Sequence, residues 1–92
     1  MKRFVIERDI PDIGSADRDA LRTAAKKSNG VLAELAPKIQ WIESFVAADK
    51  TFCVYMAEDE GVIHEHARRS GFPATKVTEI RKMFDPTTEK AG

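Results

Sequence analysis

Four short segments of the 92-residue chain are rich in apolar β-branched and aromatic residues, which suit the pleated surface of a sheet. Polar residues, glycine or proline bound each segment, as is usual for strands. The second and third segments are separated by a short connection, 48–50, and this spacing predicts a hairpin. The predicted strands span residues 3–9, 39–47, 51–57 and 75–84.

Apolar residues recur at three- and four-residue steps in two other segments, which is typical of amphipathic helices. The first stripe runs from Leu21 to Leu35, and Ser15 is a suitable N-cap before it. Gly71 is well placed to end the second helix. The predicted helices span residues 15–35 and 59–70.

The resulting order of elements is β-α-β-β-α-β, which predicts an α+β fold of the ferredoxin-like kind. Right-handed crossovers place both helices on one face of a four-stranded antiparallel sheet. We expect one domain that covers residues 1–92, with a polar C-terminal tail at 85–92. The second face of the sheet has no element to cover it.

Strict alternation along each strand divides the side chains between the two faces of the sheet. We assign to the helix-facing core Phe4, Ile6, Ile42, Val46, Phe52, Val54, Met56, Ile80 and Phe84. The remaining face is too apolar for water alone, so we expect two copies to pack sheet against sheet in a homodimer, as in dimeric α/β barrels. The residues expected on this dimer face are Val5, Trp41, Glu43, Phe45, Glu79 and Met83.

Both histidines lie in the helix predicted at 59–70, two positions apart. Residues at this spacing point about 200° apart around a helix, so His64 and His66 cannot bind one ion together. We expect His64 to face solvent and His66 to face the sheet. His66 is then either a histidine at the edge of the core, hydrogen-bonded to a backbone carbonyl, or a metal ligand or acid-base group in a cleft.

Other side chains with ligand chemistry share the uncovered face in this register. Imidazole, carboxylate and thiolate together suit nickel, zinc or copper better than calcium or magnesium. Their positions do not follow the spacing of a zinc finger or of an H-E-x-x-H helix. Taken alone, the single cysteine is more typical of a small buried hydrophobic residue than of a ligand or nucleophile. The candidate metal ligands are His66, Glu7, Cys53 and Tyr55.

The charge balance excludes several classes of partner. Lys and Arg number 15, as do Asp and Glu, so no excess of positive charge is present to bind nucleic acid or an anionic membrane. No stretch approaches the roughly 18 apolar residues of a membrane span. One cysteine cannot form an intramolecular disulfide, which agrees with a reducing compartment. We therefore expect a cytoplasmic protein.

Five stretches of the sequence carry a family resemblance: VIERDIP at 5–11, SNGVLAEL at 28–35, IQWIESFVAADKTFCVYMAEDE at 39–60, HEHARRSGFPATKVTEI at 64–80 and DPTT at 85–88. Together they resemble a family of small bacterial proteins of unknown function that includes a ferredoxin-like nickel-binding protein from actinobacteria. The resemblance implies a ferredoxin-like homodimer that binds nickel or another divalent transition metal.

Three hypotheses follow. The first is a non-catalytic, metal-binding homodimer with His66 as the best single ligand. The second is a cofactor-free enzyme or small-molecule-binding protein of the dimeric α/β barrel type, whose pocket between sheet and helices is lined by Trp41, Tyr55 and His66. The third is an interaction module whose uncovered face only forms the dimer.

Overall fold

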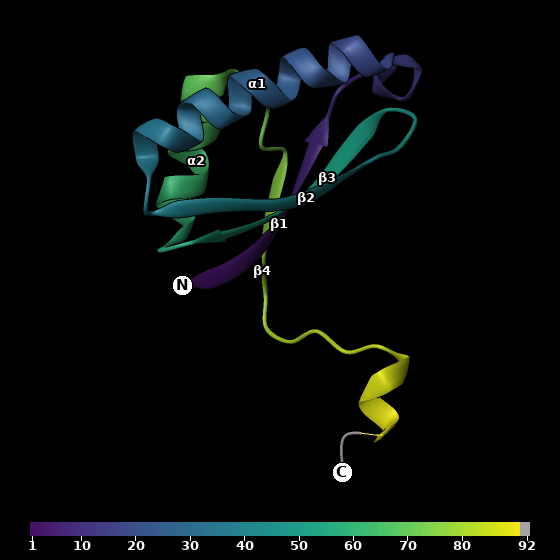
Figure 1. Ribbon diagram of the computed structural model, residues 1–92, viewed down its shortest axis with the longest axis vertical. Helices are drawn as coiled ribbons and strands as arrows, with labels where there is room; N and C mark the ends of the chain where they lie inside the picture. Colours follow the sequence, from purple (N-terminus) through teal and green to yellow (C-terminus); the bar gives the residue numbers. More distant parts are fainter. Residues whose placement is uncertain (91–92) are drawn as a thin grey trace.

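The computed structural model describes residues 1–90, which form a four-stranded antiparallel sheet with two helices on one face (Figure 1). The spatial order β2-β3-β1-β4 places the first and third strands in the centre. This architecture confirms the predicted ferredoxin-like α+β fold. Residues 91–92 of the predicted tail lie outside the described residues. The elements are β1 (Lys2–Asp9), η1 (Ile13–Ser15), α1 (Arg18–Leu35), β2 (Ile39–Val46), β3 (Lys50–Ala57), α2 (Glu60–Ser70), β4 (Lys76–Ile80) and η2 (Pro86–Lys90).

Aspartates cap both helices at their N-termini. Asp17 accepts a hydrogen bond from the backbone N–H of Ala20 at 2.8 Å, so α1 begins later than predicted, and the predicted cap Ser15 belongs to the 3-10 helix η1. Asp59 accepts one from the backbone N–H of Val62 at 3.0 Å. Helix α2 ends at Gly71, whose φ of 81° lies in the left-handed region.

Strand β4 ends at Ile80, four residues before the predicted end. Within residues 1–90 it pairs with β1 alone, which begins at Lys2, and Ile80 already pairs with Arg3. Beyond Lys2 a longer β4 would have no backbone partner. Met83 and Phe84 are 67% and 83% exposed, and the chain leaves the sheet toward η2 (Figure 1).

Pairing between β1 and β3 decides which side chains face the helices. Phe4 lies opposite Tyr55 and Ile6 lies opposite Cys53, and directly opposed residues share a face. Apolar side chains occur at successive positions of β3 and so on both of its faces, and hydrophobicity alone does not distinguish these faces. The predicted assignment of β3 is wrong, because its buried side is the one that carries Thr51, Cys53, Tyr55 and Ala57.

A β-bulge in β2 changes the alternation in that strand. Trp41 pairs with Tyr55 while Glu43 pairs with Val54, which leaves Ile42 as the extra residue. Trp41 therefore faces the helices, contrary to its predicted place on the dimer face, whereas Glu43 and Phe45 lie on the uncovered face.

The uncovered face is apolar but differs in membership from the predicted one. Glu79 lies opposite Phe4 on the helix-facing side, so its predicted placement is also wrong, and Met83 lies beyond the end of β4. We call this side of the sheet the open face; its residues are Val5, Glu43, Phe45, Phe52, Val54, Met56 and Ile80.

Candidate functional site: a cavity beneath helix α1

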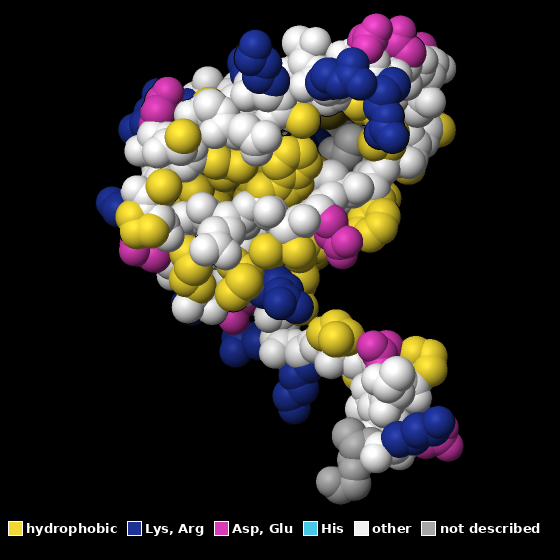
Figure 2. All heavy atoms as spheres, in the orientation of Figure 1, with side chains coloured by type: hydrophobic (Ala, Val, Ile, Leu, Met, Phe, Trp, Pro, Cys, Tyr) yellow, Lys and Arg dark blue, Asp and Glu magenta, His cyan; other side chains and the backbone are white. Residues whose placement is uncertain are grey.

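A cavity of about 830 Å³ lies between α1 and the helix-facing side of the sheet. Figure 2 shows it as a hollow in which hydrophobic side chains gather. Residues from β1, β2 and β3 form the sheet side, and the loop after α2 closes one end. The residues that line the cavity include Arg8, Arg18, Arg22, Ala25, Ser28, Trp41, Cys53 and Tyr55.

Backbone hydrogen bonds hold the lip of the cavity that η1 forms. The N–H of Gly14 donates to the carbonyl of Ala48 at 2.9 Å, and the N–H of Ile10 donates to the carbonyl of Asp49 at 3.0 Å. A Cβ at Gly14 would lie 2.8 Å from the Ala47 carbonyl oxygen, so only glycine fits this contact. Segment 10–14 is thereby fixed to the connection between β2 and β3.

His66 is fully buried beside the cavity. Its side chain enters from α2, is 1% exposed, and its Nε2 is hydrogen-bonded to Ser28 Oγ at 3.1 Å. Its ring centroid lies 5.4 Å from that of Tyr55. The Ser28 hydroxyl of α1 is thus a partner of the ring. The second ring nitrogen, Nδ1, is buried with no partner within the described residues.

The environment of His66 keeps its imidazole neutral. Burial, and to a smaller extent the positive charge of Arg8, lower the pKa of His66 from 6.5 to about 4. A hydrogen bond with the backbone of Ser28 opposes this change but does not cancel it. In the tautomer in which Nε2 donates to Ser28, Nδ1 carries a free lone pair at neutral pH.

Arg8 is a functional candidate that sequence reasoning missed. It is 3% exposed, and its Nη1 donates to the carbonyl oxygens of Pro73 at 2.9 Å and Phe72 at 3.4 Å. Its guanidinium carbon lies 5.9 Å from the centre of the Tyr55 ring. Nη2 is buried without a partner within residues 1–90. The available signal was its position in β1, two residues after Ile6 and so on the same face.

Tyr55 and Cys53 lie side by side on β3 and line the cavity. The Tyr55 ring stacks on Trp41 with a centroid separation of 6.4 Å. Burial raises the pKa of Tyr55, and this effect exceeds the opposing effects of Ser28 and Arg8, so the phenol stays protonated at neutral pH. The Cys53 thiol is buried, and its Sγ lies 3.6 Å from Thr51 Oγ1.

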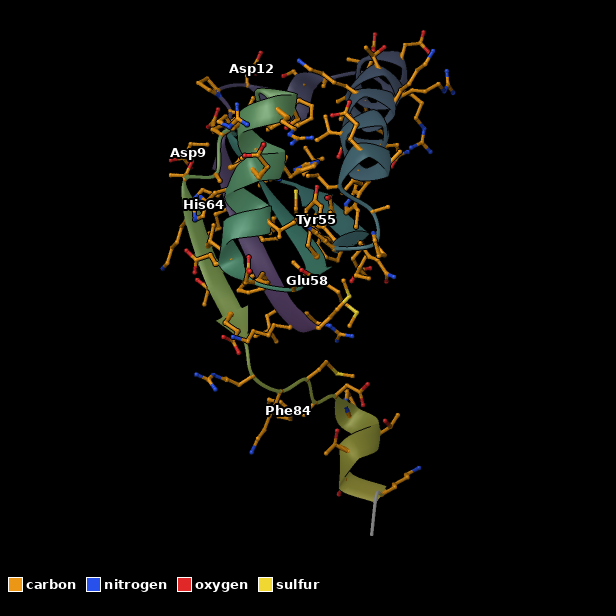
Figure 3. The ribbon with its side chains drawn as sticks, turned by 90° about the vertical axis from the view of Figure 1, so that its left-hand side faces the viewer. Asp9, Asp12, Tyr55, Glu58, His64 and Phe84 are labelled. Atoms are coloured by element: carbon orange, nitrogen blue, oxygen red, sulfur yellow. The ribbon has the colours of Figure 1, made fainter. Side chains whose placement is uncertain are left out.

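Glu7 does not join these residues. It lies opposite Phe52 on the other face of the sheet, where its Oε1 is 3.4 Å from Lys50 Nζ. The expectation that Glu7 shares a site with Cys53 and Tyr55 is therefore wrong. His64 faces outward from α2, with its Nε2 3.0 Å from Glu60 Oε2 (Figure 3). Residues 1–90 contain no cluster of three His, Cys, Asp or Glu residues able to hold a metal.

Fold and cavity define a small ferredoxin-like α+β protein with a ligand-sized space between its sheet and its helices. Residues 4–80 match the family described as "Nickel responsive protein SCO4226-like", and the chain belongs to that family.

The solved structures include a similar fold, the crystal structure of SCO4226 from Streptomyces coelicolor A3(2). Its TM-score is 0.75 at 14% identity, and the alignment covers 89% of this chain and 99% of that one. No curated protein matches this chain. Within residues 1–90, neither helix combines the length and the apolar character that crossing a membrane requires.

Proposed function

We propose that the protein has a nickel-linked role and binds nickel or a similar divalent ion as a cytoplasmic homodimer. The observation that carries this proposal is the match of residues 4–80 to a family described as nickel responsive. The single cysteine and the balanced charge of the sequence support the cytoplasmic part of this proposal.

His66 is the ligand that the site supports best. Its imidazole is neutral at pH 7, as metal binding requires, and Nδ1 has no partner within residues 1–90. Cys53 and Tyr55 lie on the same side of the sheet, although the raised pKa of Tyr55 disfavours a phenolate ligand. Because one described chain offers no complete ligand cluster, we propose that water completes the coordination.

The open face supports pairing with a second copy. Phe45 is 56% exposed, and Val5, Phe52, Val54 and Met56 are only half-buried although they form a continuous apolar surface on three neighbouring strands. An antiparallel sheet with such a face usually packs against another apolar layer.

Calorimetric titration of untagged protein with nickel tests the metal proposal. We expect the wild type to bind at about micromolar Kd or tighter, and His66→Gln to weaken binding at least about tenfold because it removes the proposed ligand. His64→Gln is the matched control on the outer side of α2, and we expect its affinity to stay within about twofold.

Two results contradict the proposal. Wild-type protein that binds neither nickel nor zinc at about micromolar concentration excludes a specific site. A loss of affinity in His64→Gln but not in His66→Gln assigns nickel to the exposed Glu60–His64 pair instead. Thermal unfolding of each variant shows whether it is folded before titration.

The cavity favours a second candidate, a small-molecule-binding protein. Its volume of about 830 Å³ lies within the range usual for ligand sites. Trp41 and Tyr55 line it as expected, whereas His66 is not among its lining residues. His66 lies behind Ser28 and Tyr55, and its low pKa makes it a weak base at neutral pH. These features favour binding over acid-base catalysis.

A further inference from the structure

We propose that the cavity beneath α1 binds an apolar organic anion, a carboxylate whose hydrocarbon body lies along Trp41 and α1 and whose charged group meets Arg8. This inference rests on the second candidate above, since it names the ligand class of the same cavity. It does not depend on nickel.

The charge of Arg8 is uncompensated within residues 1–90. A guanidinium that is 3% exposed has lost nearly all its hydration, and a buried charge without a counter-charge is strongly unfavourable. Both carbonyl contacts of Arg8 use Nη1, while Nη2 has no partner. None of the ion pairs within residues 1–90 involves Arg8. A carboxylate at this end of the cavity supplies both the counter-charge and the missing acceptor.

The charged side chains that line the cavity are all positive. Arg18 and Arg22 from the first turns of α1 are exposed and add two cations, and no carboxylate is among the described residues that line the cavity. Asp19 pairs with Arg22 at 2.8 Å, but both side chains are largely exposed. A cavity lined by one sign of charge attracts the opposite sign.

The remaining wall of the cavity is apolar. Leu21, Ala24, Ala25, Trp41 and Phe72 offer hydrocarbon surface and no charge, while Arg8 lies beside the Tyr55 ring. Such a division suits an amphipathic ligand with one charged end. A fully hydrophilic anion would leave the apolar wall uncovered.

Fluorescence of the single tryptophan, which lines the cavity, provides the test. Wild-type protein is titrated at about pH 7.5 with decanoate and, separately, with decanol, which has the same hydrocarbon chain without the charge. We expect decanoate to bind at least about tenfold more tightly, and added salt to reduce this difference.

Two variants locate the binding. Ala25→Phe fills the cavity from α1 and is expected to abolish binding of both probes, whereas Ala33→Phe, at an exposed position of the same helix, is expected to leave binding unchanged. Arg8→Leu should remove the preference for decanoate; the comparison of the two probes on wild-type protein holds even where this variant does not fold.

The results of these titrations distinguish the organic-anion inference from the broader small-molecule candidate. Equal affinity for decanoate and decanol overturns the inference but leaves the small-molecule candidate intact. Binding of neither probe overturns both. Binding that survives in Ala25→Phe places the probes outside the cavity and also overturns the inference.

Discussion

Acidification from about pH 7 to about pH 4 is expected to lower the unfolding free energy of the wild type by about 3 kcal/mol more than that of His66→Gln. The pKa of His66 is about 4 in the folded protein and 6.5 in the unfolded chain. Between these values the unfolded state binds the proton and the folded state does not. The stability that neutral His66 contributes is therefore complete above about pH 6.5 and is lost as the pH falls toward about 4.

Denaturant unfolding at a series of pH values and one fixed protein concentration measures this difference. Carboxylates titrate in both proteins, so the gap between the two curves isolates the imidazole. His64→Gln is the matched control, because His64 is exposed and its hydrogen bond is to Glu60 on its own helix. Parallel pH curves for wild type and His66→Gln contradict the buried, neutral histidine.

Val54→Lys is expected to convert the proposed homodimer into a monomer, with an increase in the dimer Kd of at least about 100-fold. Val54 lies on the central strand β3, between Val5 of β1 and Glu43 of β2. Pairing of two open faces would bury both introduced ammonium groups, and each would lose its hydration even with Glu43 of the neighbouring strand beside it. Sedimentation velocity or light scattering across micromolar concentrations distinguishes the two masses.

Ala33→Lys is the matched control, since it adds the same charge on an exposed position of α1, away from the open face. We expect it to remain dimeric. Wild-type protein that is monomeric throughout this concentration range contradicts the homodimer, and a dimeric Val54→Lys places the interface elsewhere.

The fold was predictable because each element has its own local signal. The periodicity from Leu21 to Leu35 and the stop at Gly71 fixed the helices closely. The faces of the strands were not predictable in the same way, because they depend on pairing between distant residues. One extra residue, Ile42, reverses the alternation that placed Trp41.

In the candidate site, too, features set by local sequence were predictable and features set by distant pairing were not. The direction of His66 follows from helix geometry, so its inward orientation could be predicted, as could the outward orientation of His64. Cys53 and Tyr55 belong to the cavity only because Ile6 and Phe4 pair with them. Arg8 was missed since a charged residue near a strand end usually faces solvent, and only the carbonyls of Phe72 and Pro73 make its burial possible.

The glycine contact at the lip of the cavity determines how the entrance can change size. Gly14 is held to Ala48 through backbone atoms at a separation that leaves no space for a side chain. This lip cannot retreat without breaking backbone hydrogen bonds to the connection between β2 and β3. The adjoining wall is helix α1, whose exposed first turn is capped by its own Asp17. We therefore expect a wider entrance to require displacement of α1, which couples ligand size to the position of this helix.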